Sequence, residues 1–324
     1  MNDLHPIAIP TPFPVGPVNV YLLDGPAPTL VDAGPNTDEA LATLRVGLAA
    51  HGCNLADVRH LVITHAHPDH CGLAARIVAE SGARVYSHRY NLALLANDQA
   101  EAEQRSAYYA RIFQQAGVPL PTLAGMQRDF SAATRYSQAV VVDVALDDED
   151  VLTLGGSPWE VIHTPGHARG HICLYHRQSG HLLSGDHLLR DISSNPILEP
   201  PLPGEAERPH SLAQYLRSLE RVAALEIEVA WPGHGAPITD PRGLIARRVR
   251  FHRRRAKQIA AVLVEGPQTA FQIATAFFPA LGGIEVLLAV SEVIGHLDIL
   301  EEEGRVGVQQ EEGIVLYALT DRRE

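Results

Sequence analysis

The sequence contains few cysteines and no long apolar run. Its 324 residues include 3 cysteines, Cys53, Cys71 and Cys173, too few for the disulfide framework of a small secreted domain. No stretch of about 18 consecutive apolar residues occurs, which excludes a helix that spans a membrane. The first residues, through Gly16, are too rich in proline to form the apolar core of a secretory signal. We therefore expect a protein of the reducing cytoplasm, without a membrane partner.

The sequence is also poor in positively charged residues. The 26 lysine and arginine residues are outnumbered by 38 aspartate and glutamate residues, which gives a formal net charge of −12. This balance argues against a protein that binds nucleic acid over most of its surface. A local phosphate-binding patch stays open as an alternative to a solvated helix face. Its residues would be Arg247, Arg248, Arg250, Arg253, Arg254, Arg255 and Lys257.

Short strands and helices alternate in the first 87 residues, which is typical of a mixed α/β protein. One helix is expected after Asn36, because Asn36 and Glu39 have the spacing of a capping box. Residues 88–137 show only helical patterns, and we interpret them as an insertion. Strands return with QAVVVDV at 138–144.

We divide the chain into a catalytic domain at 1–245 and a small domain at 246–324. In the small domain three helices precede two short strands, an order similar to that of a winged helix. A winged helix that reads DNA needs basic side chains on its third helix, but the residues here are acidic. They are Glu292, Asp298, Glu301, Glu302 and Glu303. We therefore expect this helix to pack on the catalytic domain or on a second copy of the chain, so that a homodimer is one candidate assembly.

Histidine is abundant, and several of the 17 histidines fall in four short motifs. Each motif follows an apolar strand, where a sheet can direct side chains from separate strands into one cleft. The motifs are THAHPDHCG, HTPGHARGH, LLSGDHLL and WPGHG, and they supply His65, His67, Asp69, His70, His167, Asp186 and His234. The first motif has no packing rationale, because burying its polar groups unpaired would cost several kcal/mol.

The spacing of the first motif indicates two adjacent metal ions. His65 and His67 are two positions apart, so their imidazoles project to the same side of an extended segment. Pro68 then starts a turn that directs Asp69 and His70 elsewhere. The predicted ligands are His65, His67 and His167 for one ion and Asp69, His70 and His234 for the other, with Asp186 as a bridge. Each ion keeps an open position, as catalytic zinc requires.

HAHPDH, PGHARGH, SGDH and PGHG, in this order, resemble the metallo-β-lactamase fold superfamily of metallohydrolases. The resemblance implies an αββα sandwich with the metal ions at one edge of two sheets, to which the helical insertion and the winged-helix-like domain are added. It also implies that Asp32, in LVDAG, hydrogen-bonds to the ligands and orients them. The metal motifs are similar to those of glyoxalase II. The added winged-helix-like tail is similar to that of the β-lactamase-like protein 2 group.

The ligand set predicts a hydrolase with two divalent ions. A histidine at position 67 departs from the di-iron flavoprotein branch of the superfamily and favours Zn²⁺, with iron or manganese as alternatives. Two ions about 3.5–4 Å apart acidify a shared water and polarise the substrate. We predict that this metal-bridging hydroxide attacks a small acyl compound (a thioester, ester or lactone) and that Asp69 acts in catalysis by relaying a proton. A single-strand RNA endonuclease or another phosphodiesterase is the alternative, since the β-lactamase-like protein 2 group includes such RNA endonucleases.

Two further groups of residues are candidates for the substrate cleft. Arg190 and Asp191 lie in the polar loop after SGDH, and we expect them to contact the substrate. The helical insertion is expected to form a lid over the metal ions. Its aromatic residues at helical spacing either face the substrate or, as is more common, form the core of the lid. These residues are Tyr108, Tyr109 and Phe113.

Overall fold

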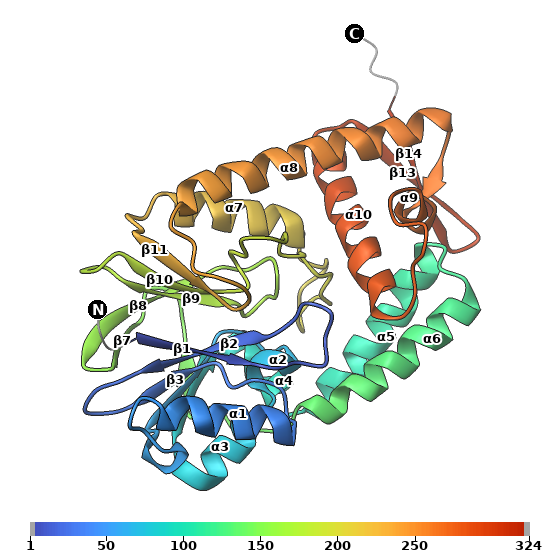
Figure 1. Cartoon of the computed structure of the whole chain (residues 1–324). Coiled ribbons are helices and arrows are strands. Elements are labelled where there is room, and N and C mark those ends of the chain that lie inside the picture. The colour runs from blue at the N-terminus through green and yellow to red at the C-terminus, as the bar shows by residue number, and fades with distance from the viewer. Residues whose placement is uncertain (1–3, 321–324) are drawn as a thin grey trace.

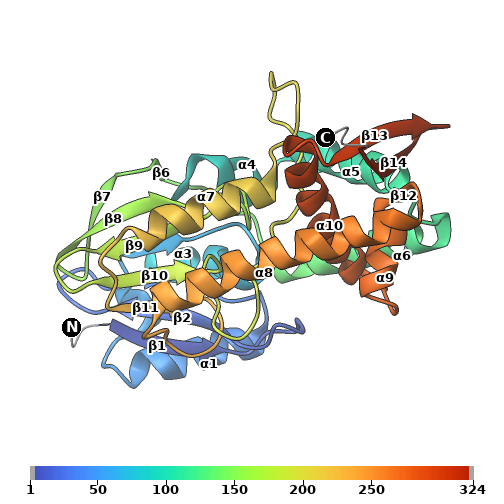
Figure 2. The ribbon, with the colours of Figure 1, turned by 90° about the horizontal axis from the view of Figure 1, so that it is seen from above.

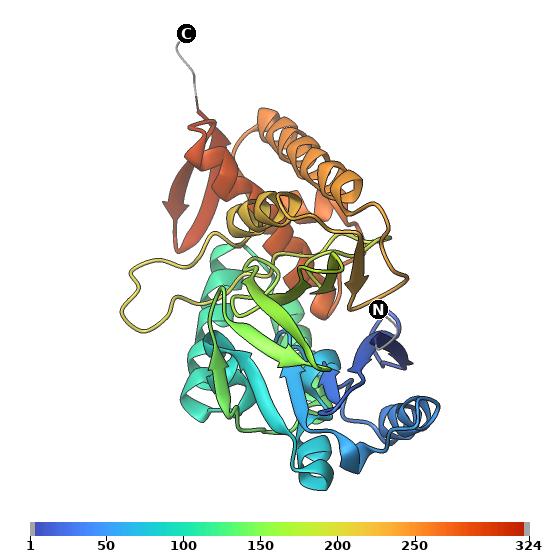
Figure 3. The same cartoon turned by 90° about the vertical axis from the view of Figure 1, so that its left-hand side faces the viewer.

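Two stacked β-sheets form the centre of the protein, as Figures 1 and 3 show from two directions. The computed structural model describes residues 4–320, apart from the side chains of residues 130 and 131. The first sheet has the strand order β1 (Leu4–Ile9), β2 (Val18–Leu23), β3 (Thr29–Val31), β4 (His60–Ile63), β5 (Arg84–His88) and β6 (Val144–Leu146). The second has the order β11 (Val229–Pro232), β10 (His181–Gly185), β9 (Ile172–His176), β8 (Ser157–His163) and β7 (Val151–Leu154).

The inner faces of the two sheets bury one apolar cluster. Tyr21 and Val62 come from the first sheet, and Trp159 and Leu174 come from the second. Burying an aliphatic or aromatic side chain of this size contributes about 1.5–3 kcal/mol, so the cluster holds the sheets face to face. The strand ends that carry the metal motifs are thereby fixed relative to one another.

Helices cover both outer faces, which completes the expected αββα sandwich. The helices α1 (Asp38–Ala49) and α3 (Ala74–Ser81) pack on the first sheet. On the second sheet lie α7 (Ser211–Ala223) and α8 (Pro241–Val262), and Figure 2 shows both from above. In α7 the buried Leu212, Tyr215, Leu219 and Val222 recur at helical spacing, which is the pattern of a helix with one face on a sheet.

The cap of α1 differs from the prediction. The capping residue is Thr37, whose side-chain oxygen accepts a hydrogen bond from the backbone N–H of Ala40 at 3.0 Å. The backbone N–H of Asn36 instead donates to the carbonyl of Tyr136. A threonine one position later satisfies the same unpaired helix N–H groups, so the predicted helix forms and the predicted capping box does not.

The strand that forms is shorter than the one predicted at 138–144 and begins later in the chain. Only Val144–Leu146 pairs with β5. Before it, the Asp143 side chain accepts a hydrogen bond from the backbone N–H of Val85 at 2.8 Å, and the N–H of Val140 donates to the carbonyl of Leu95. These bonds hold the segment against the sheet edge without a ladder.

The insertion and the C-terminal segment form a further body beside the sandwich, shown in Figure 1. The insertion holds α4 (Leu92–Leu95), α5 (Gln99–Gln115) and α6 (Leu120–Ala133), in agreement with the prediction of helices and no strand. The C-terminal segment holds β12 (Gln268–Thr269), α9 (Ala270–Phe277), α10 (Ile284–Glu302), β13 (Val306–Glu311) and β14 (Ile314–Leu319). One apolar cluster joins them, with Tyr108, Phe113, Ile273, Val290 and Leu297 among its members.

The three C-terminal strands form a small sheet of order β12-β14-β13. Three helices and a hairpin are therefore present in the expected sequence, while their description as a winged helix stays a prediction. The predicted boundary at residue 245 also stays a prediction, and α8 runs continuously across it from Pro241.

The acidic third helix, α10, packs on residues within 1–245, which is one of the two predicted alternatives. Asp298 accepts hydrogen bonds from both terminal nitrogens of Arg208, at 2.5 and 2.8 Å. A Cβ on Gly295 would lie 2.9 Å from the Cβ of Leu212 in α7, so the two helices approach closely. None of the helices within residues 4–320 combines the length and the apolar character needed to span a membrane.

Candidate metal centre

The strand ends bring the four histidine motifs together at one edge of the sandwich. β4 ends two residues before His65, and β10 ends immediately before Asp186. β11 ends two residues before His234, and β8 ends four residues before His167. A bridge between Val18 and His234 and a hydrogen bond from the N–H of Ile172 to the carbonyl of Thr64 connect the two sheets at this edge. The motifs are therefore loops on a rigid scaffold.

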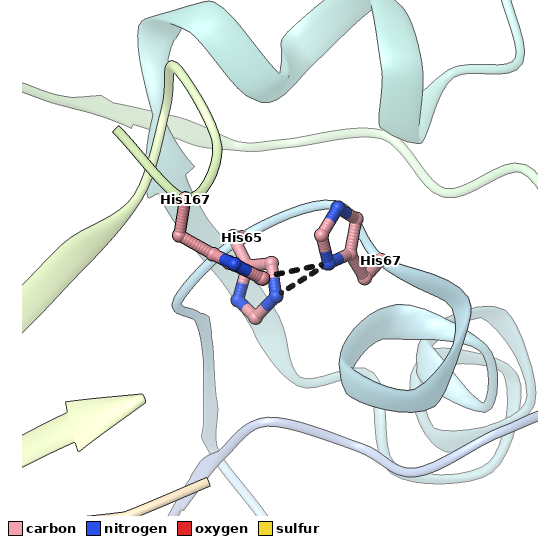
Figure 4. A group of neighbouring side chains, drawn as sticks. All are labelled: His65, His67 and His167. Atoms are coloured by element: carbon pink, nitrogen blue, oxygen red, sulfur yellow. Dashed lines mark hydrogen bonds between the residues drawn. The ribbon is translucent and has the colours of Figure 1, made fainter. Parts of the chain in front are cut away.

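Three imidazoles from two motifs converge on one point, as Figure 4 shows. Nδ1 of His67 lies 3.0 Å from Nε2 of His65 and 3.1 Å from Nε2 of His167. His65 is fully buried and His167 nearly so. Three ring nitrogens at such distances can coordinate one ion between them.

A second cluster of ligand atoms lies beside the first. Nε2 of His234 is 3.3 Å from Oδ2 of Asp69, and Nε2 of His70 is 4.0 Å from the same oxygen. Asp186 reaches both clusters, because its Oδ1 is 3.4 Å from Nε2 of His70 and its Oδ2 is 3.7 Å from Nε2 of His167. All seven predicted ligands are thus brought together, with Asp186 between the two groups.

In His167 and His234 the outward-facing nitrogen is held by a main-chain carbonyl, which fixes the tautomer. Nδ1 of His167 donates to the carbonyl of Asn195 at 2.9 Å, and Nδ1 of His234 donates to the carbonyl of Pro17 at 2.8 Å. Because the proton is on Nδ1, the lone pair on Nε2 faces the centre. Such bonds orient a histidine ligand and raise its basicity.

Asp32 supports ligands of both clusters. Its Oδ2 accepts a hydrogen bond from Nδ1 of His70 at 2.7 Å and another from the Thr64 hydroxyl at 2.9 Å. The Thr64 hydroxyl oxygen in turn accepts from Nδ1 of His65 at 3.0 Å. Asp32 has φ of 64°, a left-handed conformation in which Asp and Asn occur more often than most residues. Its contacts are those that the resemblance implies.

Burial keeps the three converging histidines neutral. It lowers the pKa of His65 well below its usual value and also lowers that of His167. For His67, burial and then the neighbouring His167 lower the pKa to about 3. Neutral imidazole is the form that binds a metal ion.

In the second cluster, neighbouring charges outweigh burial and set the direction of the pKa shifts. Burial alone would lower the pKa of His70, but Asp186, Asp32 and Asp69 outweigh it and raise the pKa well above its usual value. Burial alone would likewise raise the pKa of Asp186, but His70 outweighs it and the pKa is lowered. A divalent cation at this point would take the place of protons in neutralising the carboxylates.

Unsatisfied buried atoms show that the site fits a metal. Nε2 of His70, Oδ1 of Asp186 and Nε2 of His234 are buried and have no hydrogen-bond partner within residues 4–320. Buried polar atoms without partners are rare in folded proteins and need an explanation. A Cβ on Gly233 would lie 2.3 Å from Oδ1 of Asp186, so the chain leaves room for this ligand only with glycine there.

The structure gives the partners of the residues that were predicted to line the substrate cleft. Arg190 and Asp191 are exposed and pair with each other at 3.1 Å, so contact with a substrate stays a prediction. Tyr108 and Phe113 are buried against the C-terminal helices, and the Tyr109 hydroxyl donates to the carbonyl of Leu198. These aromatic residues lie in a core that the insertion shares with the C-terminal segment, and the lid over the metal ions stays a prediction.

Several supporting residues were not predicted. Thr64, Pro17 and Asn195 contact ligands through a hydroxyl or a main-chain carbonyl, and carbonyls carry no sequence signal. His171 comes from the same motif as His167 and supports Asp186. Its Nε2 accepts from the backbone N–H of Asp186 at 3.0 Å, and its Nδ1 faces the Thr164 hydroxyl at 2.8 Å.

With this geometry established, comparison with known proteins assigns the family. A family model described as the metallo-beta-lactamase superfamily matches residues 13–234, and the chain belongs to this superfamily. A probable metallo-hydrolase of Bacillus subtilis (strain 168), YqjP, is 38% identical over 327 positions, which cover 99% of each chain. The crystal structure of the metallo-beta-lactamase family protein TTHA1429 from Thermus thermophilus has a TM-score of 0.83 and 32% identity, and the match covers 99% of each chain.

A shorter match concerns a relative with a named activity. The atrochrysone carboxyl ACP thioesterase AgnL7 of Paecilomyces divaricatus is 27% identical over 118 residues, or 36% of this chain and 33% of the relative. Superfamily membership and the cluster of histidine and aspartate ligands together support a metal-dependent hydrolase.

Proposed function

We propose that the protein hydrolyses small acyl compounds, namely thioesters, esters or lactones, with two Zn²⁺ ions at the candidate metal centre. The observation that carries this proposal is the position of Asp186 between two sets of ligand atoms. Its two carboxylate oxygens lie within 3.7 Å of Nε2 of His70, His167 and His234. A carboxylate so placed can serve two ions at once.

The donor set favours zinc. Five of the seven ligands are imidazoles, and Cys71, the cysteine next to His70, is buried in an apolar cluster. Burial raises the pKa of Cys71 to about 12, and its Sγ faces the Ser137 hydroxyl at 3.7 Å. Imidazole-rich sites suit zinc, although iron also binds such sites.

Two ions held by these residues would acidify a water molecule and polarise the substrate carbonyl. In the reaction, water adds to the carbonyl carbon, the bond from that carbon to sulfur or oxygen breaks, and a proton passes from the water to the leaving group. Asp69 is the residue we assign to carry this proton. Its carboxylate faces the centre beside His234, and His70 and His234 outweigh burial to hold its pKa low.

The acyl substrate is supported by two observations. The relative AgnL7 is named as a thioesterase. The net charge of −12 and the acidic side chains of α10 disfavour a long polyanion close to that helix.

Cleavage of single-stranded RNA, or of another phosphodiester, is the second candidate function. The observation in its favour is the exposed basic face of α8, on which Arg250, Arg253, Arg254 and Lys257 are solvent-accessible. Other members of the basic run have partners. Arg255 pairs with Glu292 at 2.9 Å, and Arg248 donates to the carbonyls of the loop after Asp186.

A turnover panel on the zinc-loaded protein tests the proposal. The panel contains acyl-coenzyme A, acyl-glutathione, a p-nitrophenyl ester, a lactone, bis-p-nitrophenyl phosphate and single-stranded RNA. We expect turnover of an acyl compound that is lost in His67→Ala and unchanged when Arg253 and Arg254 are both replaced by Gln. RNA cleavage that disappears in the double arginine variant, without acyl turnover, would select the second candidate instead.

A further inference from the structure

The beginning of α10 and the loop before it line a cavity that the hydrolytic residues do not use. Its volume is about 420 Å³, which is within the range of about 300–1,000 Å³ for small-molecule sites. Most of the wall is apolar and includes Phe277, Phe278, Leu281, Leu288 and Ala289. A cavity of this size and lining suits an apolar group.

Asn195 connects this cavity to the metal centre. Its side chain lines the cavity, and its amide nitrogen donates to the carbonyl of Leu288 in α10 at 3.0 Å. Its main-chain carbonyl accepts from Nδ1 of His167 at 2.9 Å. One residue therefore touches both a metal ligand and the cavity wall, and the cavity lies behind the His167 ring, on the side of Nδ1.

The same residue leaves an acceptor unused. The side-chain oxygen of Asn195 is buried and has no hydrogen-bond partner within residues 4–320. A buried amide oxygen without a donor is unfavourable. A bound molecule that offers an N–H or O–H group at the inner end of the cavity would satisfy it, as would a water that accompanies the molecule.

The charged groups at the wall favour an apolar over an anionic ligand. Glu292 pairs with Arg255, from Oε1 to Nε at 2.9 Å, and the Arg255 guanidinium lies over the rings of Phe277 and Phe278 at 4.8 and 5.5 Å. The other carboxylate of the wall, Glu285, is exposed. Lysine, arginine and histidine are all missing from the described lining. Phosphate or carboxylate groups would therefore find no basic partner in the lining, whereas hydrocarbon would meet aromatic and aliphatic side chains.

We propose that this cavity binds the hydrocarbon chain of a medium-chain acyl substrate. The inference rests on the proposed acyl hydrolysis and adds the substrate class. The carbonyl carbon is positioned at the metal centre, and the chain passes Asn195 to lie between the phenylalanines and Leu288. Burial of each additional methylene is favourable, so the cavity selects longer chains over acetyl.

Substitution at Leu288 tests this assignment in two ways. The first compares kcat/KM for octanoyl and acetyl esters with the same leaving group in the zinc-loaded protein. The second measures binding of octanoate and acetate by calorimetry, in which acetate controls for a carboxylate bound to metal. Leu288→Trp fills the cavity. Val264→Trp is the matched control, because Val264 is an exposed apolar residue, 72% accessible, that is not part of the wall.

We expect the wild-type protein to prefer octanoyl over acetyl. In Leu288→Trp both the kinetic preference and the affinity for octanoate should fall by about tenfold or more, a loss of the size that a changed apolar pocket produces. Val264→Trp should leave both unchanged, and thermal denaturation of each variant confirms folding. Should Leu288→Trp misfold, Leu288→Ala takes its place, and enlargement of the cavity should then move the preference to chains longer than octanoyl.

The two arms separate failure of this inference from failure of the proposed function. Acyl turnover with a chain-length preference that Leu288 variants do not change would overturn the cavity assignment and leave the hydrolase intact. A protein that hydrolyses no acyl compound would overturn the function. The calorimetry alone would then test the cavity assignment. If octanoate bound no more tightly than acetate, the cavity assignment would be overturned as well.

Discussion

Oδ2 of Asp32 lies 2.7 Å from Nδ1 of His70, with both side chains buried. The same oxygen accepts from Thr64, whose hydroxyl holds His65. One carboxylate therefore orients a histidine in each of the two ligand clusters, directly in one case and through a hydroxyl in the other. This arrangement makes Asp32 the residue whose loss should disturb both clusters without removing a ligand.

Replacement of Asp32 by asparagine should weaken metal binding by about 10–100-fold, the usual effect of losing a partner behind a ligand. The amide keeps the shape and tolerates the left-handed backbone, but its N–H group cannot accept from His70. Competition with a chromophoric chelator measures the affinity. Asp38→Asn is the matched control, because its side chain is 96% exposed at the start of α1. Equal affinities in the two variants would contradict the assigned role.

Gly233→Ala should impair the second ligand cluster and leave the fold intact. The added Cβ would lie 2.3 Å from Oδ1 of Asp186 and 2.7 Å from Cε1 of His70. Displacing ligands by about 1 Å is enough to damage a site. Elemental analysis should show reduced metal content, with an unchanged circular dichroism spectrum. Gly125→Ala, in the middle of α6 with Arg128 no closer than 3.8 Å, is the control and should bind metal normally.

The Glu199 carboxylate ties the insertion to a ligand loop. It accepts from the backbone N–H of Arg169 at 2.7 Å, two residues after His167, and lies 3.7 Å from Nη2 of Arg105 in α5. Glu199 is 8% exposed, and breaking a buried charge pair costs about 3–5 kcal/mol. Urea denaturation of Glu199→Ala should show a loss of this order. The exposed pair of Arg45 and Glu80 provides the comparison, and Glu80→Ala should change stability by about 1 kcal/mol or less.

A buried histidine pair should make the protein less stable in acid. Nδ1 of His252 in α8 lies 3.2 Å from Nε2 of His296 in α10. Burial, then the neighbouring histidine, lowers the pKa of His252 to about 3, and burial lowers that of His296 to about 4. Both pKa values are depressed on folding, so the unfolded chain binds protons first. The contribution of the pair to the free energy of unfolding is fully present above pH 6.5 and decreases as the pH falls towards 4.

This loss amounts to about 1.4 kcal/mol per pH unit for each histidine that is protonated only in the unfolded chain. Urea denaturation at a series of pH values measures the slope. His252→Asn should reduce this slope by about the contribution of one histidine, whereas replacement of the exposed His51 by Asn should leave the slope unchanged. A slope identical in wild type and His252→Asn would show that the pair does not control acid stability.

Much of the fold and of the ligand set was predictable from local patterns. The metal motifs lie immediately after buried strands, and strand periodicity can be read within a few residues, so the convergence of His65, Asp186 and His234 followed from their sequence positions. The sandwich was implied by the resemblance that those motifs carry. The acidic residues of the third helix likewise predicted that it packs on protein, where Asp298 meets Arg208.

What could not be predicted depends on tertiary contacts. The carbonyls of Pro17 and Asn195 support His234 and His167, and any residue supplies a carbonyl. The prediction of a strand at 138–144 was wrong because a valine-rich segment has strand propensity whether or not a sheet edge is free to pair with it. The capping box failed because Thr37, one position later, competes for the same helix start.

The number of bound ions tests the central claim most directly. Protein loaded with zinc and passed through a desalting column should carry two equivalents per chain by inductively coupled plasma mass spectrometry. His67→Ala and His234→Ala should each carry one, because each removes a ligand from a different cluster. A wild-type protein with one equivalent or none, or single variants that both retain two, would contradict a centre in which Asp186 joins two ions.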